Sequence, residues 1–175
     1  LLAAARWGVP YAMSLFAQDK LDRGLAADAK ELYVLIDRYW PEEFGAKAGM
    51  DAAEQKIIDG LMNVGTDAAY EQAALRAAAI GDTTREEKAV IARAELAAAN
   101  GDTGAAEALL APLEDNEEAQ SALRRLIYDV AKSAKEKLDY PTAISRFDSL
   151  GDYEDAAAQK TDCIDLYGRQ LMREG

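Results

Sequence analysis

The chain contains no histidine and a single cysteine, Cys163. Histidine is the usual general base near neutral pH and the commonest metal ligand, so its absence excludes Ser-His and Cys-His nucleophiles. One cysteine without histidine can build neither a structural zinc site nor an intrachain disulfide. Because Asp162 and Asp165 flank Cys163, we expect the thiol pKa to be raised and the thiol to be inert and partly buried.

Long apolar runs, phosphate-binding loops and an excess of basic residues are also missing. No apolar run approaches the roughly 20 residues that cross a bilayer, so we expect no direct membrane insertion of this segment. Neither a GxGxxG nor a GxxxxGK pattern is present. The 32 acidic residues outnumber the 20 basic ones, which gives a net charge of −12 and argues against nucleic acid and anionic membrane surfaces as partners. We therefore expect no metal and no cofactor.

Paired acids are the remaining candidates for catalysis, at Glu42–Glu43, Glu86–Glu87 and within Glu114–Glu118. Glycosidases need only two carboxylates at the right separation, which keeps a carboxylate-dependent helical hydrolase as a distant alternative. Adjacent acids on one helix do not converge on a substrate, however, and acids in a first turn stabilise the helix. Helix capping and solubility are the favoured roles, and we expect a protein that is not an enzyme.

One segment occurs three times. Tyr70–Asp82 reads YEQAALRAAAIGD, Thr103–Asp115 reads TGAAEALLAPLED, and Tyr140–Asp152 reads YPTAISRFDSLGD, so the copies start 33 and 37 residues apart. A helical unit of this period buries its apolar face only by stacking on its neighbours. The repeat predicts an all-α fold of about nine helices, arranged as antiparallel pairs in a right-handed α-solenoid.

Local signals place the helices. The expected pairs are 9–23 with 26–40, 51–64 with 67–80, 85–100 with 103–112, and 117–137 with 140–150, followed by a helix over 153–174. Pro10 suits a first turn, and Thr84–Glu87 has the spacing of a capping box. Asp51 to Glu54 places acids across a first turn in the same way. The residues 1–175 are expected to form a single helical-repeat domain, with a sub-boundary at 41–50, where Pro41 precedes a loop.

Apolar residues follow helical spacing, and the first fifty residues are rich in aromatic side chains. Leu32, Leu35, Ile36 and Tyr39 form a stripe that we expect to face the core. Trp7, Trp40, Tyr33 and Tyr39 could bind a ligand, but a role in filling the core is favoured, because aromatic side chains supply the most burial per residue.

The third copy resembles a known family. Residues 137–147, KLDYPTAISRF, look like the second-helix core of a tetratricopeptide repeat, with a small residue at Ala143 and an aromatic residue at Phe147. Residues 147–156 follow an F-x-x-L-G-x-Y-x-D-[SA] pattern that is similar to a variant in many bacterial repeat proteins. The match covers mainly 124–175 and 67–119, and Ala77 lacks the expected aromatic. The resemblance implies an α-solenoid that serves as a non-catalytic interaction module, from a bacterial source.

One basic face runs against the overall charge. Arg124, Tyr128, Lys132 and Lys135 are spaced by four and three residues, so they lie on one side of the helix expected over 117–137. The resemblance implies that this helix lines the concave side of an array, where basic residues can hold a peptide carboxylate. These four residues are the candidate peptide-binding site. The alternative is a solvated face that balances nearby acids.

The leading hypothesis is a helical-repeat scaffold that binds a protein or peptide partner along its concave face. The alternative is a structural spacer or oligomerisation segment of a larger bacterial protein, which could itself be membrane-anchored; the sequence leaves the cellular location open. The last expected helix carries Ile164, Leu171 and Met172 without a following partner. We therefore expect an exposed apolar stripe there, covered by a continuing array beyond 175 or by self-association.

Overall fold

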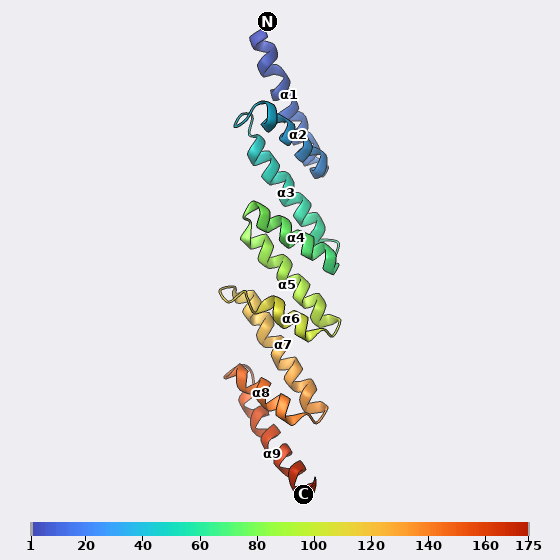
Figure 1. Ribbon diagram of the computed structural model, residues 1–175, viewed down its shortest axis with the longest axis vertical. Helices are drawn as coiled ribbons and strands as arrows, with labels where there is room; N and C mark the ends of the chain where they lie inside the picture. Colours follow the sequence, from blue (N-terminus) through green and yellow to red (C-terminus); the bar gives the residue numbers. More distant parts are fainter. Residues whose placement is uncertain (1, 175) are drawn as a thin grey trace. The chain divides into compact units, whose positions relative to one another are not determined.

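A computed structural model describes the backbone of residues 2–174 and the side chains of residues 8–173. In this part of the chain there are nine α-helices and no strand, which confirms the predicted all-α fold (Figure 1). The helices are α1 Leu2–Asp22, α2 Ala26–Tyr39, α3 Ala46–Met62, α4 Asp67–Ile80, α5 Thr83–Ala99, α6 Thr103–Leu110, α7 Glu117–Glu136, α8 Tyr140–Leu150 and α9 Ala156–Glu174. The handedness of a solenoid stays a prediction.

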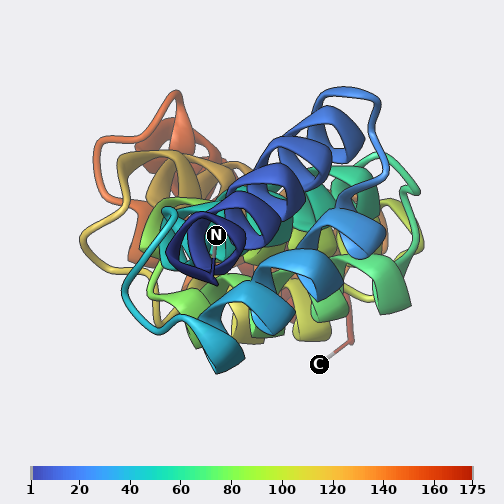
Figure 2. The same cartoon turned by 90° about the horizontal axis from the view of Figure 1, so that it is seen from above.

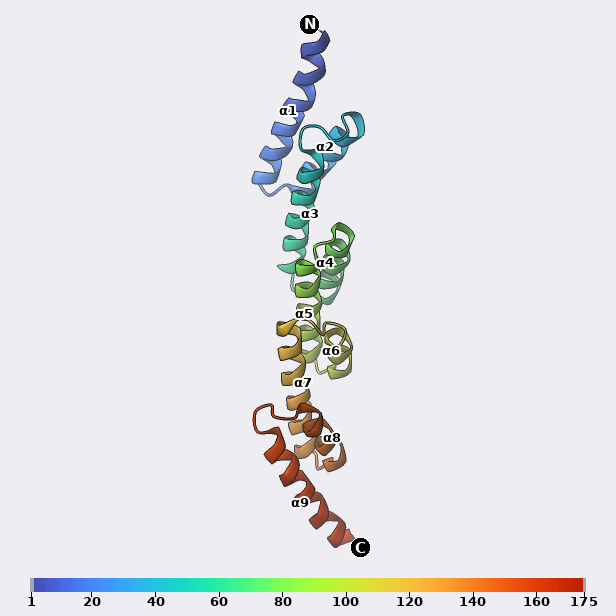
Figure 3. The same ribbon diagram turned by 90° about the vertical axis from the view of Figure 1, so that its left-hand side faces the viewer.

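The chain divides into two compact units, Leu1–Ala89 and Val90–Gly175, with the boundary inside α5. The sub-boundary expected at 41–50 falls within the first unit. In the first unit α1 and α2 lie side by side and are joined by a short turn (Figure 2). In the second, α6 and α8 lie on the same side of α7 (Figure 3).

Alanine dominates the buried positions of the first unit, where a few large side chains fill the remaining space. Tyr33, Ile36 and Ile58 are the largest members, 4 % exposed or less. The other buried members of its two apolar clusters are Ala17, Leu21, Ala26, Ala29, Ala46, Ala53, Ala73, Ala77 and Ala89. Small side chains let helix backbones approach closely, so these helices are held by close contact over many short residues.

Two apolar clusters also form the core of the second unit. Phe147 is its largest fully buried side chain, and the ring of Tyr128 packs edge-on against it with the centroids 5.8 Å apart. The other buried members of this cluster are Ala131, Ala134, Tyr140, Ala143, Ala156 and Cys163. The second cluster consists of Ile91, Ala94, Ala106, Leu110, Ala119 and Leu126. Ala143 and Phe147, a small residue and an aromatic residue four positions later on α8, are therefore both core residues.

Several helix boundaries differ from the sequence prediction. Helix α3 begins at Ala46, so Gly49, which was expected in the loop before this helix, lies inside it. A β-carbon at this position would come within 2.4 Å of the Tyr33 ring, and glycine therefore permits close packing of the helix against that ring. Pro10 lies inside α1, since the helix begins at Leu2, so the prediction of a first-turn proline was wrong.

The capping prediction at Thr84–Glu87 was also wrong. Helix α5 starts at Thr83, and the Asp82 carboxylate accepts the hydrogen bond from the Arg85 amide at 3.1 Å. Asp82 therefore does the capping two residues earlier than expected. Glu54 is not a first-turn acid either: it lies in the middle of α3 and is the one buried charged residue among those described.

The repeated arginine of the first and third copies has a structural use. Arg146 on α8 donates from Nη1 to Glu107 Oε2 on α6 at 2.8 Å. Arg76 on α4 donates from Nη1 to Glu54 Oε1 on α3 at 2.6 Å, and Lys30 on α2 donates to the other oxygen of the same carboxylate. In each unit the repeated arginine ties a second helix of a pair back to an acid on an earlier helix.

Candidate binding groove

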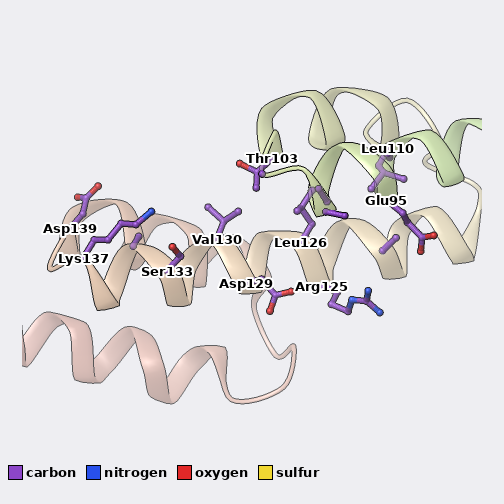
Figure 4. A pocket seen from close by; sticks show the side chains of 16 residues that line it. Glu95, Thr103, Leu110, Arg125, Leu126, Asp129, Val130, Ser133, Lys137 and Asp139 are labelled. Atoms are coloured by element: carbon purple, nitrogen blue, oxygen red, sulfur yellow. The ribbon is translucent and has the colours of Figure 1, made fainter. Parts of the chain in front are cut away.

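A groove of about 680 Å³ opens in the second unit between the C-terminal part of α5, the start of α6 and the length of α7. Its lining residues run along α7 from Arg125 to Ala134 and continue to Lys137 and Asp139 in the turn before α8, with Thr103 and Leu110 of α6 facing them (Figure 4). Arg125 and Lys137, the residue that directly follows α7, are twelve positions apart, so the groove extends over about 18 Å at 1.5 Å per residue. An extended peptide covers that length with about six residues.

The floor of the groove is apolar and made largely of small residues. Leu110 and Leu126 are buried and Val130 is half-buried, and between them the floor is formed by Ala94, Ala98, Ala122 and Ala134. Alanine at these positions leaves space that larger apolar side chains would fill. The groove exists because α5 and α7 face each other through short side chains.

The rim of the groove carries charges. Glu95, Arg125, Asp129 and Lys137 are exposed, and none of the four makes an ion pair or a side-chain hydrogen bond within the described residues. The fifth rim charge, Asp139, accepts a hydrogen bond from the Thr142 amide at 3.3 Å and so caps α8. The rim thus presents two free acids and two free bases around an apolar floor.

The predicted basic face lies on a different side of α7, and its side chains point to neighbouring elements. Tyr128 donates a hydrogen bond to Asp155 at 2.5 Å, and this bond raises the pKa of Tyr128 to about 12. Lys135 donates to Asp162 at 2.5 Å and to Gln159 at 2.7 Å. The bond to Asp162 raises the pKa of Lys135 above its ordinary value. These two residues join α7 to α9 and the turn before it.

The other two residues of the predicted face are more exposed. The Lys132 ammonium lies 5.5 Å from the centroid of the Tyr128 ring, in a cation–π contact. Arg124 lies beside a shallow acidic hollow that includes Glu114 and Glu117. The four residues Arg124, Tyr128, Lys132 and Lys135 do not converge on the groove. That they bind an acidic peptide stays a prediction, and it now rests on Arg124 and Lys132.

The aromatic residues of the first unit fall into separate environments. Tyr33 is 4 % exposed and belongs to the core, whereas Tyr39 is 65 % exposed and lies beside the half-buried Trp40, with the ring centroids 5.9 Å apart. The Trp7 side chain lies outside the described residues. A role in the core therefore applies to Tyr33 and not to Tyr39.

The last helix carries the expected apolar stripe. Ile164, Leu171 and Met172 are 49 %, 51 % and 78 % exposed, while Leu166 and Tyr167 are half-buried against the α8 cluster. Coverage of the stripe by another chain or by further repeats stays a prediction. Cys163 on the same helix is fully buried, and burial raises the pKa of its thiol.

Other kinds of site find little support in the described residues. No three acidic or thiol side chains among them come together in a way that could hold a metal ion. Nor does any helix in that part of the chain combine the length and apolar character of a membrane span. Comparison with protein-family models, with curated proteins and with solved structures finds no match to this chain.

Proposed function

We propose that this chain is a non-enzymatic helical-repeat scaffold that holds a short segment of a partner protein in the groove between α5, α6 and α7. The observation that carries the proposal is an apolar floor about 18 Å long bordered by free charges of both signs. A core of that kind with a polar rim is the usual build of a protein interface.

The length of such a site suits a short peptide segment, because about six extended residues span it. Helices that are already formed spare the scaffold the ordering cost of binding, so contact with the floor is available for affinity. The rim charges at Glu95, Arg125, Asp129 and Lys137 would act chiefly on association rate and on the choice of partner. The resemblance of the third repeat copy to tetratricopeptide repeats, which commonly hold peptides, supports the same assignment.

The test is to fill the groove. A hexapeptide phage-display library is selected on the wild-type chain, and the enriched peptides are measured by fluorescence polarisation against Ala98→Trp and Ala157→Trp. Ala98 is a half-buried floor residue, while Ala157 is exposed on α9 and does not line the groove. We expect Ala98→Trp to lower affinity at least tenfold and Ala157→Trp to leave it unchanged. Failure to enrich any peptide, or equal affinity for both variants, would overturn the proposal.

The alternative of an oligomerisation segment is favoured by the apolar stripe on α9. Exposed apolar patches on monomers commonly mark interaction sites. If the stripe joins two copies, Leu171→Glu should shift a concentration-dependent dimer toward monomer in sedimentation velocity. If the wild-type chain stays monomeric up to about 100 μM, any dimer has a Kd weaker than that concentration. This result would count against the alternative.

A further inference from the structure

The turns that join the first to the second helix of each pair contain a residue with positive φ. In the first three pairs this residue is glycine: Gly24 at 79°, Gly65 at 73° and Gly101 at 84°. In the fourth pair it is Leu138, at 63°. Glycine adopts this left-handed conformation without steric cost, whereas a leucine β-carbon crowds the following carbonyl oxygen.

The fourth turn is otherwise built like the third. The Leu138 amide donates to Lys135 O at 3.0 Å, and the Asp139 amide donates to Ala134 O at 2.9 Å. The turn at Gly101 has the same two bonds, at 3.0 and 2.9 Å. This is the Schellman pattern that closes a helix with a left-handed residue. The turn at Leu138 is therefore of the same type as the turn at Gly101, and Leu138 occupies a position that suits glycine.

Leu138 also gains little from burial within the chain. It is 63 % exposed, among the most exposed large apolar residues described. The left-handed backbone conformation costs a leucine stability that glycine would not lose, and the side chain recovers little of it by burial within the described residues. Residues held in such conformations concentrate at binding sites.

The location of Leu138 places it next to the groove. Leu138 is not itself a lining residue, but its two sequence neighbours, Lys137 and Asp139, both line the end of the groove at the turn between α7 and α8 (Figure 4). Lys137 is a free cation, whereas Asp139 is engaged in capping α8. The free acids Glu95 and Asp129 lie toward the opposite end of the groove, where Arg125 is also found (Figure 4). One end thus offers a positive charge beside an exposed apolar side chain, and the other end has a net negative charge.

We propose that Leu138 is a partner-contacting residue that selects the segment bound in the groove. This inference rests on the proposed function and names the ligand class. The segment is extended and places an apolar side chain against Leu138, with an acidic group beside it for Lys137. A basic group follows about four residues away for Glu95 and Asp129, because Lys137 and Asp129 are eight helical positions, or about 12 Å, apart.

The experiment uses the same hexapeptide phage library on the wild-type chain and on Leu138→Gly, with Leu138→Asn as a second variant that also tolerates positive φ. We expect wild-type selection to enrich peptides with adjacent apolar and acidic residues and a basic residue about four positions away. Their affinity for Leu138→Gly should fall about tenfold. The thermal midpoint should stay equal or rise by roughly 2–4 °C, since a strained position is relieved.

The outcomes separate the two proposals. If peptides bind the wild type but bind Leu138→Gly equally well, the role of Leu138 is overturned and the groove assignment stands. Should Leu138→Gly and Leu138→Asn both lower the thermal midpoint, the side chain stabilises the fold, and its assignment to a partner fails. A change in sedimentation coefficient on Leu138→Gly, without any loss of peptide affinity, would assign the residue to contact with a second copy and also refute the inference. Absence of any enriched peptide refutes the groove itself.

Discussion

The buried carboxylate of Glu54 gives the sharpest test of how the first unit is held together. Its side chain is 5 % exposed and accepts hydrogen bonds from Lys30 on α2 and from Arg76 on α4. One acid thus connects three successive helices. The substitution Glu54→Gln keeps the volume but removes the charge, and its amide nitrogen would face one of the two cations.

The expected loss of stability follows from how deeply Glu54 and its two cationic partners are buried. Removing one partner of a fully buried ion pair costs about 3–5 kcal/mol, because the other charge is left uncompensated. Here the Lys30 and Arg76 side chains are 38 % and 41 % exposed, so water can solvate them after the change. Discounting for that screening, we expect Glu54→Gln to lower the free energy of unfolding by about 2 kcal/mol at pH 7.

The effect should depend on pH in a defined direction. Burial raises the pKa of Glu54, but hydrogen bonds and charges from Lys30 and Arg76 outweigh it, so the pKa lies below its ordinary value of 4.5. A carboxyl with a lowered folded pKa stabilises the fold above its unfolded pKa and loses that contribution as the pH falls. The difference between wild type and Glu54→Gln should therefore be complete at pH 7 and shrink below about pH 4.5.

The assay can follow this unit alone. Both tryptophans, Trp7 and Trp40, lie within residues 1–89, so tryptophan fluorescence during urea denaturation reports on the first unit. Asp51→Asn is the matched control, because Asp51 is an exposed acid on the same helix. A loss of stability in Glu54→Gln no larger than in Asp51→Asn, or one that is equal at pH 7 and pH 3.5, would refute the reasoning.

Two further predictions test packing in each unit. Gly49→Ala should destabilise the first unit by about 1–3 kcal/mol, because its β-carbon would lie 2.4 Å from the Tyr33 ring. Gly60→Ala on the same helix meets open space and should stabilise by roughly 0.5–1 kcal/mol, so equal effects of the two changes in urea denaturation would contradict the packing described. Cys163 is fully buried with a raised pKa, so a thiol reagent such as DTNB should label it slowly in buffer and rapidly in urea. Fast labelling of the native protein would show that the α8–α9 contact opens readily.

The fold was largely predictable from the sequence because its signals are local. The helices expected over 51–64 and 85–100 do end before Gly65 and Gly101, and both glycines have positive φ in the structure. The errors arose at residues whose role depends on a contact with a residue distant in the sequence. Gly49 was expected in a loop, yet it lies inside α3, where the ring of Tyr33 occupies the space that a β-carbon would need. Glu54 was assigned to a first turn, whereas its partners are on two other helices.

Core positions show the same limit. The spacing of large apolar residues predicted that Leu35 and Tyr39 face inward, but they are 38 % and 65 % exposed. The buried face of α2 consists instead of Ala26, Ala29, Tyr33 and Ile36. Both stripes have helical spacing, so periodicity alone cannot choose between them. When a helix packs through alanine, its core positions are residues of low hydrophobicity, and a search for stripes of large apolar residues misses them.

The basic face illustrates why charges are hard to assign from one sequence. Arg124, Tyr128, Lys132 and Lys135 do share a side of α7, as their spacing required. What the spacing could not reveal is that Asp155 and Asp162, each 27 residues downstream, lie against Tyr128 and Lys135. This offset of 27 residues is shorter than the repeat spacings of 33 and 37, so the repeat itself gave no signal for either pair.

The groove escaped prediction for the opposite reason: it is formed by side chains that are short. A search for motifs finds reactive, charged or metal-binding side chains, and the floor residues Ala94, Ala98 and Ala134 carry none of these. An alanine-rich sequence predicts close packing of helices. That prediction holds where two helices meet, as around Ala143 in the α8 cluster. Between α5 and α7 the same residue leaves space instead. The difference lies in whether another helix covers the alanines; in the proposed function, a partner segment takes that place.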